Sequence, residues 1–309
     1  MTFVSVVMPC YNEEGNVREA YEQVKQAFVQ LPDYTYEHIF IDNASKDRTV
    51  AVLKDIAQQD KNVKVIVNVR NFGHIRSPYH ALLQARGDAV ITLASDLQDP
   101  PCLIPEFIRK WQEGYRVVVG VKKKSEESRI VFAVRTSYYR LLRQMSEIEL
   151  VENYTGFGLY DQQVIEILRT LNDPYPYFRG LIAELGFESA RIEYVQPTRK
   201  RGITKNNFFT LYDMAMLGMT SHSKLPLRLA TMLGFLSAAA SLLVALFYFV
   251  YKLLFWSNFS VGSAPLVIGL FFFSSVQLFF LGIVGEYVGF MHTQVLKRPL
   301  VVEKERINF

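Results

Sequence analysis

The chain of 309 residues has only two cysteines, and they form no recognisable pattern. Cys10 and Cys102 lie far apart, and neither belongs to a Cys-x-x-Cys motif. The five histidines also lack the spacing of metal ligands. These features argue against a disulfide framework and a structural zinc site, and they favour a reducing compartment.

A strong excess of one charge is missing as well. The chain carries 34 basic and 30 acidic residues, a net charge of +4, which is too small to predict a nucleic-acid partner. The first residues, Met1 to Pro9, contain no basic region, long apolar core or cleavage site. We therefore expect no signal peptide and a catalytic part in the cytoplasm.

Apolar residues, in contrast, are abundant near the end of the chain. Half of all residues are hydrophobic, and the mean hydropathy is +0.10, which suits a chain that is partly in a membrane. Leu227–Trp256 and Ala264–Met291 are almost wholly apolar, and each exceeds the roughly 20 residues needed to cross a bilayer. Buried core helices are the alternative, but two runs with so few charges favour a transmembrane hairpin at 226–293.

Basic residues flank this hairpin on one side only. They are Lys200, Arg201, Lys205, Lys224 and Arg228 before it, and Lys297, Arg298, Lys304 and Arg306 after it. The connection Ser257–Ser263 has none, so the positive-inside rule predicts a multi-pass protein of the cell membrane with both termini cytoplasmic, including the tail 294–309. The flanking charges predict contact with anionic membrane lipids. At 206–225 the apolar residues follow a helical spacing, which predicts an amphipathic interfacial helix, with core packing as the alternative.

The region 1–205 alternates short β-branched runs with helical patterns. The predicted strands are Val4–Met8, His38–Ile41, Val63–Val67, Ala89–Leu93 and Val117–Val121, and helices are expected at Glu14–Gln30, Asp47–Gln59 and Leu103–Glu113. Such alternation predicts an α/β domain with a mostly parallel, Rossmann-like sheet covered on both faces. Ligands bind such sheets beyond the carboxyl ends of the strands.

Polar residues follow four of the predicted strands. The segments are Pro9–Glu14, Asp42–Thr49, Arg70–Gly73 and Ser95–Pro101. An aspartate at a strand end can bind a base or ribose, and carboxylates near a diphosphate suit a hard divalent cation. Taken singly, Ser45 or Asp47 could cap a helix and Asp99 could close a turn. The four segments together predict a nucleotide site.

These segments belong to a larger set of motifs. It comprises P-x-Y-N-E at Pro9–Glu13, Asp42–Thr49, Arg70–Gly73, D-L-Q-D-P-P at Asp96–Pro101, F-R-G-L at Phe178–Leu181, Arg201–Lys205, and G-E-Y-x-G at Gly285–Gly289. Over essentially its whole length the chain resembles the family 2 glycosyltransferases of GT-A fold, in the polyprenyl-phosphate branch with C-terminal membrane helices. Relatives of this kind include dolichol-phosphate mannose synthases and bactoprenol glucosyltransferases.

The resemblance implies roles for individual residues. The nucleotide-sugar would be bound by Pro9, Tyr11, Asn12, Glu13, Asp42, Asn43, Asn71, Ser95 and Asp96. Asp96 and Gln98 would bind Mg²⁺ or Mn²⁺ on the diphosphate. The acceptor phosphate would meet Lys122, Arg135, Arg179, Arg201 and Lys205. Asp96, Arg135 and Arg179 would be the catalytic residues.

Three departures from the family pattern stand out. The usual D-x-D is Ala94-Ser95-Asp96 here, and the second aspartate of D-D-G-S is Asn43. The usual G-D-F-R-L is Thr155–Leu159, in which Gly156 and Gly158 replace the acid and the base. A lipid phosphate is already anionic near neutral pH, so it needs cationic placement more than a general base.

The expected reaction is an inverting transfer of a sugar from a nucleotide-sugar, taken to be UDP-linked, to polyprenyl (undecaprenyl) phosphate. A catalytically impaired membrane scaffold and a processive polysaccharide synthase are the alternatives, although the synthase motif Q-x-x-R-W is absent from the sequence. His74 could touch a phosphate or pack as a neutral ring. Glu286 could pair with Arg228, and Gly282, Gly285 and Gly289 permit a homo-oligomer. The sequence leaves the sugar open.

Overall fold

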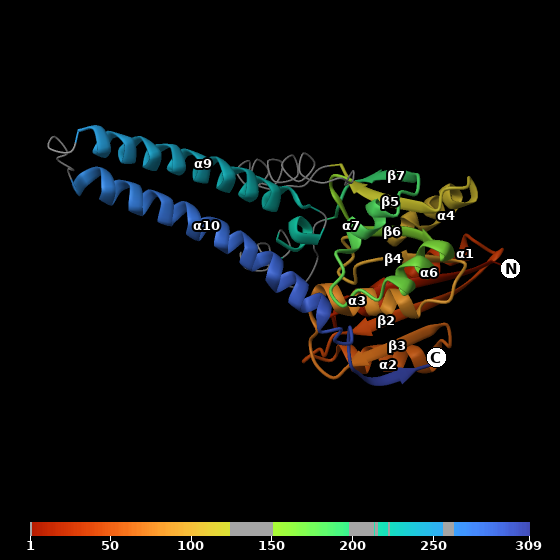
Figure 1. Ribbon diagram of the computed structural model, residues 1–309. Helices are drawn as coiled ribbons and strands as arrows, with labels where there is room; N and C mark the ends of the chain where they lie inside the picture. The colour runs from red at the N-terminus through yellow and green to blue at the C-terminus, as the bar shows by residue number, and fades with distance from the viewer. Residues whose placement is uncertain (1, 124–150, 198–212, 214–215, 222, 256–262) are drawn as a thin grey trace.

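A computed structural model describes residues 2–123, 151–197, 213, 216–221, 223–255 and 263–309 (Figure 1). The predicted site residues Arg135, Arg201 and Lys205 lie outside these ranges, as do 206–212 of the predicted interfacial helix.

An eight-stranded mixed sheet forms the catalytic domain. Its order is β7-β5-β6-β4-β1-β2-β3-β8. The strands are β1 (Thr2–Cys10), β2 (Tyr34–Asp42), β3 (Val63–Asn68), β4 (Ala89–Thr92), β5 (Val117–Lys122), β6 (Tyr154–Asp161), β7 (Ser189–Tyr194) and β8 (Glu303–Ile307). Strands β4, β1, β2 and β3 are mutually parallel, whereas β6 and β8 run antiparallel to their neighbours. The α/β fold and the five strands expected from the sequence are confirmed.

Helices cover both faces of this sheet. They are α1 (Val17–Val29), α2 (Thr49–Gln59), α3 (Gly73–Gln84), the 3₁₀ turn η1 (Pro101–Leu103), α4 (Ile104–Gln112), α6 (Gln162–Leu171) and α7 (Phe178–Glu184). Apolar residues of α1, α2 and α4 pack on one face, around Val6 and Phe40. Those of α3, α6 and α7 pack on the other, around Ile39 and Ile66. Because the second half of β2 is buried on both faces, Ile39, Phe40 and Ile41 are consecutive apolar residues and do not alternate with polar ones.

The end of the chain returns to the sheet. The sequence analysis placed 294–309 in a separate tail, but Glu303–Ile307 forms β8, antiparallel to β3. Lys54 of α2 pairs with Glu305 at 2.6 Å, and the Asn308 amide donates to the Ala57 and Val63 carbonyls at 2.7 and 2.8 Å. The last residues therefore cover the edge of β3, which would otherwise expose unpaired backbone groups.

Two long helices extend away from the catalytic domain, side by side (Figure 1). They are α9 (Leu225–Leu254) and α10 (Ser263–Val295), and the segments Leu225–Tyr251 and Gly269–Val295 are long and apolar enough to cross a membrane. None of the most apolar part of either helix is buried inside the chain; Phe235, for instance, is 72% exposed. A core role is therefore excluded, and the helices are those of a membrane-associated protein.

Two hydrogen bonds fix the base of this hairpin. The Tyr287 hydroxyl of α10 donates to the carbonyl of Ser223, just before α9. The Gln294 amide donates to Asp173 Oδ1 of the catalytic domain at 2.9 Å. Helix α10 therefore enters the catalytic domain in a fixed orientation, beside α3 (Figure 1).

Candidate active site

The carboxyl ends of β1, β2 and β4 meet at one edge of the sheet, because these strands are parallel neighbours. The backbone N–H of Asn43 donates to the Cys10 carbonyl at 2.9 Å, and that of Leu93 donates to the Val7 carbonyl at 3.0 Å. The polar segments after these strands are therefore neighbours in space.

The loop after β1 is held by the loop after β2. Ser45 Oγ accepts from the Asn12 N–H at 2.8 Å and donates to Asp42 Oδ1. Asn12 Oδ1 accepts from the Lys46 N–H at 2.7 Å. Asn12 has a φ of 56°, a left-handed conformation that asparagine tolerates better than most residues.

Asp42 is fully buried at the end of β2, and burial raises the pKa of its carboxyl despite hydrogen bonds from Ser45. Ser45 occupies two of the roughly four lone-pair positions of this carboxylate and the Ala44 N–H a third, which leaves one acceptor position. A donor group of a base or ribose is therefore a chemically suitable partner for Asp42.

Glu13 is also buried, and it joins β1 to the start of α2. Its N–H donates to Thr49 Oγ1 at 2.8 Å, and its Oε2 accepts from the Asn16 amide at 2.5 Å. Asn16 and Thr49 thus support the motif that contains Glu13, a role the sequence analysis did not assign to them.

Asn43 makes every hydrogen bond that its amide allows. Its Nδ2 donates to Asn71 Oδ1 and to the Gly73 carbonyl, both at 3.0 Å. Its Oδ1 accepts from the Asn68 amide at 3.2 Å and from the Phe72 N–H at 2.9 Å. Two donors and two acceptor positions are all that an amide offers. The structure therefore gives Asn43 an organising role, joining β2 to the loop before α3.

The predicted metal-binding segment follows β4. Asp96 Oδ1 accepts from the Gln98 N–H at 3.1 Å, and Leu97 between them has a φ of 62°. Next to this turn, Asp99 accepts from the Ala94 N–H at 3.1 Å and from the Tyr194 hydroxyl of β7 at 3.0 Å. Burial raises the pKa of Asp99 to about 6, against the opposing effects of Tyr194 and the Lys122 charge.

A divalent cation fits this segment only with help from a substrate. Across the described residues, no group of three or more His, Cys, Asp and Glu side chains could hold a metal ion. One carboxylate, one amide oxygen, substrate phosphate oxygens and water are nevertheless a donor set that Mg²⁺ accepts. Asp96 and Gln98 therefore suit an ion that is bound together with a diphosphate.

Strand β6 carries the segment that departs most from the family pattern. A Cβ at Gly158 would lie 2.4 Å from the Val118 carbonyl oxygen, so no larger residue fits there without a shift of the β5–β6 pairing. Gly156 has a φ of +103°, and its carbonyl accepts from Tyr160 at 2.9 Å and from Thr92. The base of the family motif is thus replaced by a glycine that packs closely on backbone, and the acid by a glycine with a positive φ.

Two predicted acceptor residues are described. Arg179, in the first turn of α7, donates to the Tyr154 carbonyl at 3.3 Å, and its Cζ lies 5.3 Å from the centre of the Tyr177 ring. Lys122 ends β5, near Asp99. His74 begins α3 and is exposed. Ser95, the residue before Asp96, is buried.

The sequence analysis missed the partnership of Asp99 with Tyr194. Asp99 was weighed only as a turn residue, and Tyr194 lies 95 residues away with no local motif to indicate it. Together they tie β7 to the segment that contains Asp96.

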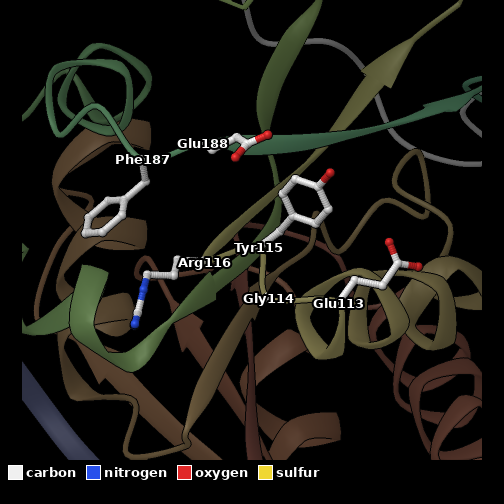
Figure 2. Close-up of a pocket in the computed structure, with 6 residues that line it drawn as sticks. All are labelled: Glu113, Gly114, Tyr115, Arg116, Phe187 and Glu188. Atoms are coloured by element: carbon white, nitrogen blue, oxygen red, sulfur yellow. The ribbon is translucent and has the colours of Figure 1, made fainter.

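A separate cavity of about 480 Å³ lies at the opposite edge of the sheet (Figure 2). It is lined by Glu113, Gly114, Tyr115, Arg116, Phe187 and Glu188, which precede β5 and β7. None of the predicted site residues lines it. Arg116 is already paired with Asp161 at 3.3 Å. This cavity is therefore distinct from the candidate active site.

Comparisons with known proteins cover the residues of the candidate active site. Residues 5–168 match the sequence model of glycosyl transferase family 2. The chain is 35% identical to the uncharacterized glycosyltransferase YkcC of Bacillus subtilis, over 96% of this chain and 92% of that one. It is 33% identical to the bactoprenol glucosyl transferase of Shigella phage SfII, over 98% and 97% of the two chains.

Among solved structures, glucosyl-3-phosphoglycerate synthase from Mycobacterium tuberculosis matches with a TM-score of 0.48 and 20% identity, covering 71% of this chain and 76% of that one. The family match includes the segments after β1, β2, β3 and β4, where the candidate site lies, and the GT-A architecture expected from the sequence agrees with the sheet described above. The chain belongs to glycosyl transferase family 2 and is a glycosyltransferase.

Proposed function

We propose that this protein transfers a sugar from a UDP-sugar to polyprenyl phosphate at the cytoplasmic face of the cell membrane, with inversion at the anomeric carbon. One observation carries the proposal. The chain matches proteins named bactoprenol glucosyl transferase over almost its full length. Its product would be a lipid-linked monosaccharide for cell-envelope glycan or lipopolysaccharide modification.

In the proposed reaction an oxygen of the lipid phosphate attacks the anomeric carbon. The bond from that carbon to the nucleotide diphosphate breaks, and the electron pair leaves with the diphosphate. Asp42 and Glu13 would hold the nucleotide, while Asp96 and Gln98 would hold Mg²⁺ or Mn²⁺. When bound there, the cation would neutralise charge on the leaving diphosphate.

The acceptor oxygen is already an anion, so the reaction needs no residue to remove a proton from it. This agrees with a glycine at position 156, where relatives of the resembled branch carry an acid. Placement of two anions beside each other needs positive charge instead. We assign that task to Arg179 and Lys122, and to Arg135, Arg201 and Lys205 outside the described residues.

The proposal also includes a division of the chain into domains. Residues 1–205, together with β8, would form the catalytic domain, 206–225 an interfacial region, and 226–293 the membrane hairpin with both termini cytoplasmic. A homo-oligomer is part of the proposal. A Cβ at Gly282, Gly285 or Gly289 of α10 would meet no described atom within 4 Å, so a second helix could approach closely there.

A donor screen tests the proposal. The full-length protein in detergent is incubated with radiolabelled UDP-sugars, Mn²⁺ and undecaprenyl phosphate, and the lipid extract is resolved by chromatography. We expect one donor to give a lipid-linked sugar, and Asp96→Asn to lower the rate at least about a hundredfold. Glu106→Gln, an exposed carboxylate on α4, is the matched control. Absence of lipid-linked sugar with every donor would favour the scaffold alternative.

A further inference from the structure

Two guanidinium groups lie against the ring of Phe72, which stands between β3 and α3. The Cζ of Arg70 lies 4.0 Å from the ring centre, and that of Arg76 lies 5.6 Å from it. Phe72 is nearly buried, and its N–H donates to Asn43 Oδ1 at 2.9 Å. The ring is therefore a fixed platform that holds two positive charges near each other.

Arg76 also contacts the segment that follows α10. Its Nη2 donates to the Pro299 carbonyl, and Pro299 comes directly after Arg298. The Nε of Arg76 is buried and has no hydrogen-bond partner among the residues that the structure describes. Burial first, and then the charges of Arg70 and Arg298, lower the pKa of Arg76. Arg70, Arg76 and Arg298 are hereafter called the arginine cluster.

Within the described ranges, no carboxylate pairs with any member of the arginine cluster. The nearby Asp173 accepts the Gln294 amide at 2.9 Å. The charge of Asp213 acts to raise the pKa values of Tyr175 and His74, but it is not among the charges that shift the pKa of Arg76. Two like charges beside a partly buried guanidinium favour a bound anion.

The position of the arginine cluster indicates which anion. Helix α10 ends at Val295, and Lys297 and Arg298 follow at once, both exposed. If α10 spans the membrane as in the proposed function, the arginine cluster lies at the depth of the lipid headgroups. We propose that the arginine cluster binds the phosphate of an anionic phospholipid headgroup and thereby holds α10 against α3.

The proposal is tested without any substrate, so its outcome is independent of glycosyl transfer. Thermal unfolding of the full-length protein in neutral detergent is followed while short-chain phosphatidylglycerol, phosphatidylcholine or inorganic phosphate is added at constant ionic strength. We expect phosphatidylglycerol to raise the Tm of the wild type, and phosphatidylcholine and inorganic phosphate to leave it unchanged. The double variant Arg70→Gln/Arg298→Gln should need at least about tenfold more phosphatidylglycerol for the same rise.

Arg109→Gln, on α4, is the control for loss of one exposed arginine, and its response should equal that of the wild type. Arg298→Gln alone is a second variant, because the exposed Arg298 has no hydrogen bond or ion pair within the described residues and its loss leaves the core intact. An equal response to phosphatidylcholine, or an unchanged response in the double variant, would overturn the proposal. A full response to inorganic phosphate would identify soluble phosphate as the ligand in place of a lipid.

Discussion

Asn43→Asp restores the aspartate that the resembled family usually has at this position, and the structure predicts that the change is harmful. The Asn43 amide donates to Asn71 Oδ1 and to the Gly73 carbonyl. A carboxylate cannot donate to either oxygen. It would also place negative charge beside both of them in a position that is only 7% exposed.

The size of the effect follows from the two lost bonds. Asn71 is exposed and Gly73 is half-buried, so each lost bond costs about 0.5–1.5 kcal/mol, and the variant should lose on the order of 1–3 kcal/mol of unfolding free energy. At about 3 °C per kcal/mol in a catalytic domain of this size, that loss corresponds to a fall in Tm of about 3–9 °C. The loop at Asn71–Gly73 should loosen with it, and the KM for the donor should rise.

Thermal unfolding and donor kinetics measure both effects. Asn12→Asp is the matched control for stability. It makes the same chemical change in the neighbouring loop, where the side-chain oxygen only accepts, from the Lys46 N–H. Its Tm should stay within about 2 °C of the wild type, since the hydrogen bond survives.

The pH dependence of the stability of Asn43→Asp is a second test of the organising role of Asn43. A carboxyl that faces two oxygens has its folded pKa raised above the unfolded value, so its destabilisation appears as pH rises through the folded pKa. The deficit of Asn43→Asp should therefore shrink at acidic pH. A variant as stable as the wild type at pH 8, with an unchanged donor KM, would refute the organising role of Asn43.

Two further predictions concern other buried groups. His38 is fully buried, neither ring nitrogen has a hydrogen-bond partner among the described residues, and burial lowers its pKa to about 3. Below about pH 6.5 the unfolded chain therefore binds a proton that the folded chain does not, which destabilises the folded state. Between pH 7 and 5 this effect costs about 2 kcal/mol of unfolding free energy, and His38→Leu should abolish that loss, as measured by urea unfolding. An unchanged pH slope would contradict this. Tyr194→Phe removes the hydroxyl that donates to the buried Asp99, and should raise the KM for Mn²⁺ about five- to tenfold in a metal titration of the transfer rate, with a fall in Tm of about 3–9 °C. An unaltered metal dependence would show that Tyr194 does not position the segment with Asp96.

The sequence predicted the strands and the site edge because both depend on local patterns. The buried strands are apolar runs, and parallel strands bring their carboxyl ends to one edge whatever the details of packing. Asp42 and Asp96 are therefore at that edge, as expected.

Other features depend on contacts between distant segments. Strand β8 alternates exposed and half-buried charged residues, so Glu303–Ile307 resembles a solvated tail until its pairing with β3 is known. The side-chain contacts of Asn43 all come from the distant segment 68–73, whereas a comparison of motifs shows only that an aspartate has become an asparagine. Gly158 is similar, since the carbonyl that excludes a side chain there belongs to β5.

Acceptor discrimination tests the central claim most directly. The full-length protein, with Mn²⁺ and its best donor, is given undecaprenyl phosphate or undecaprenol, and the rate of lipid glycosylation is measured from pH 5 to 9. We expect transfer to the phosphate only, at a rate that is flat at neutral and alkaline pH and falls below about pH 6, where a phosphate monoester gains a proton. Comparable transfer to undecaprenol would contradict it, because an alcohol needs the general base that Gly156 cannot supply.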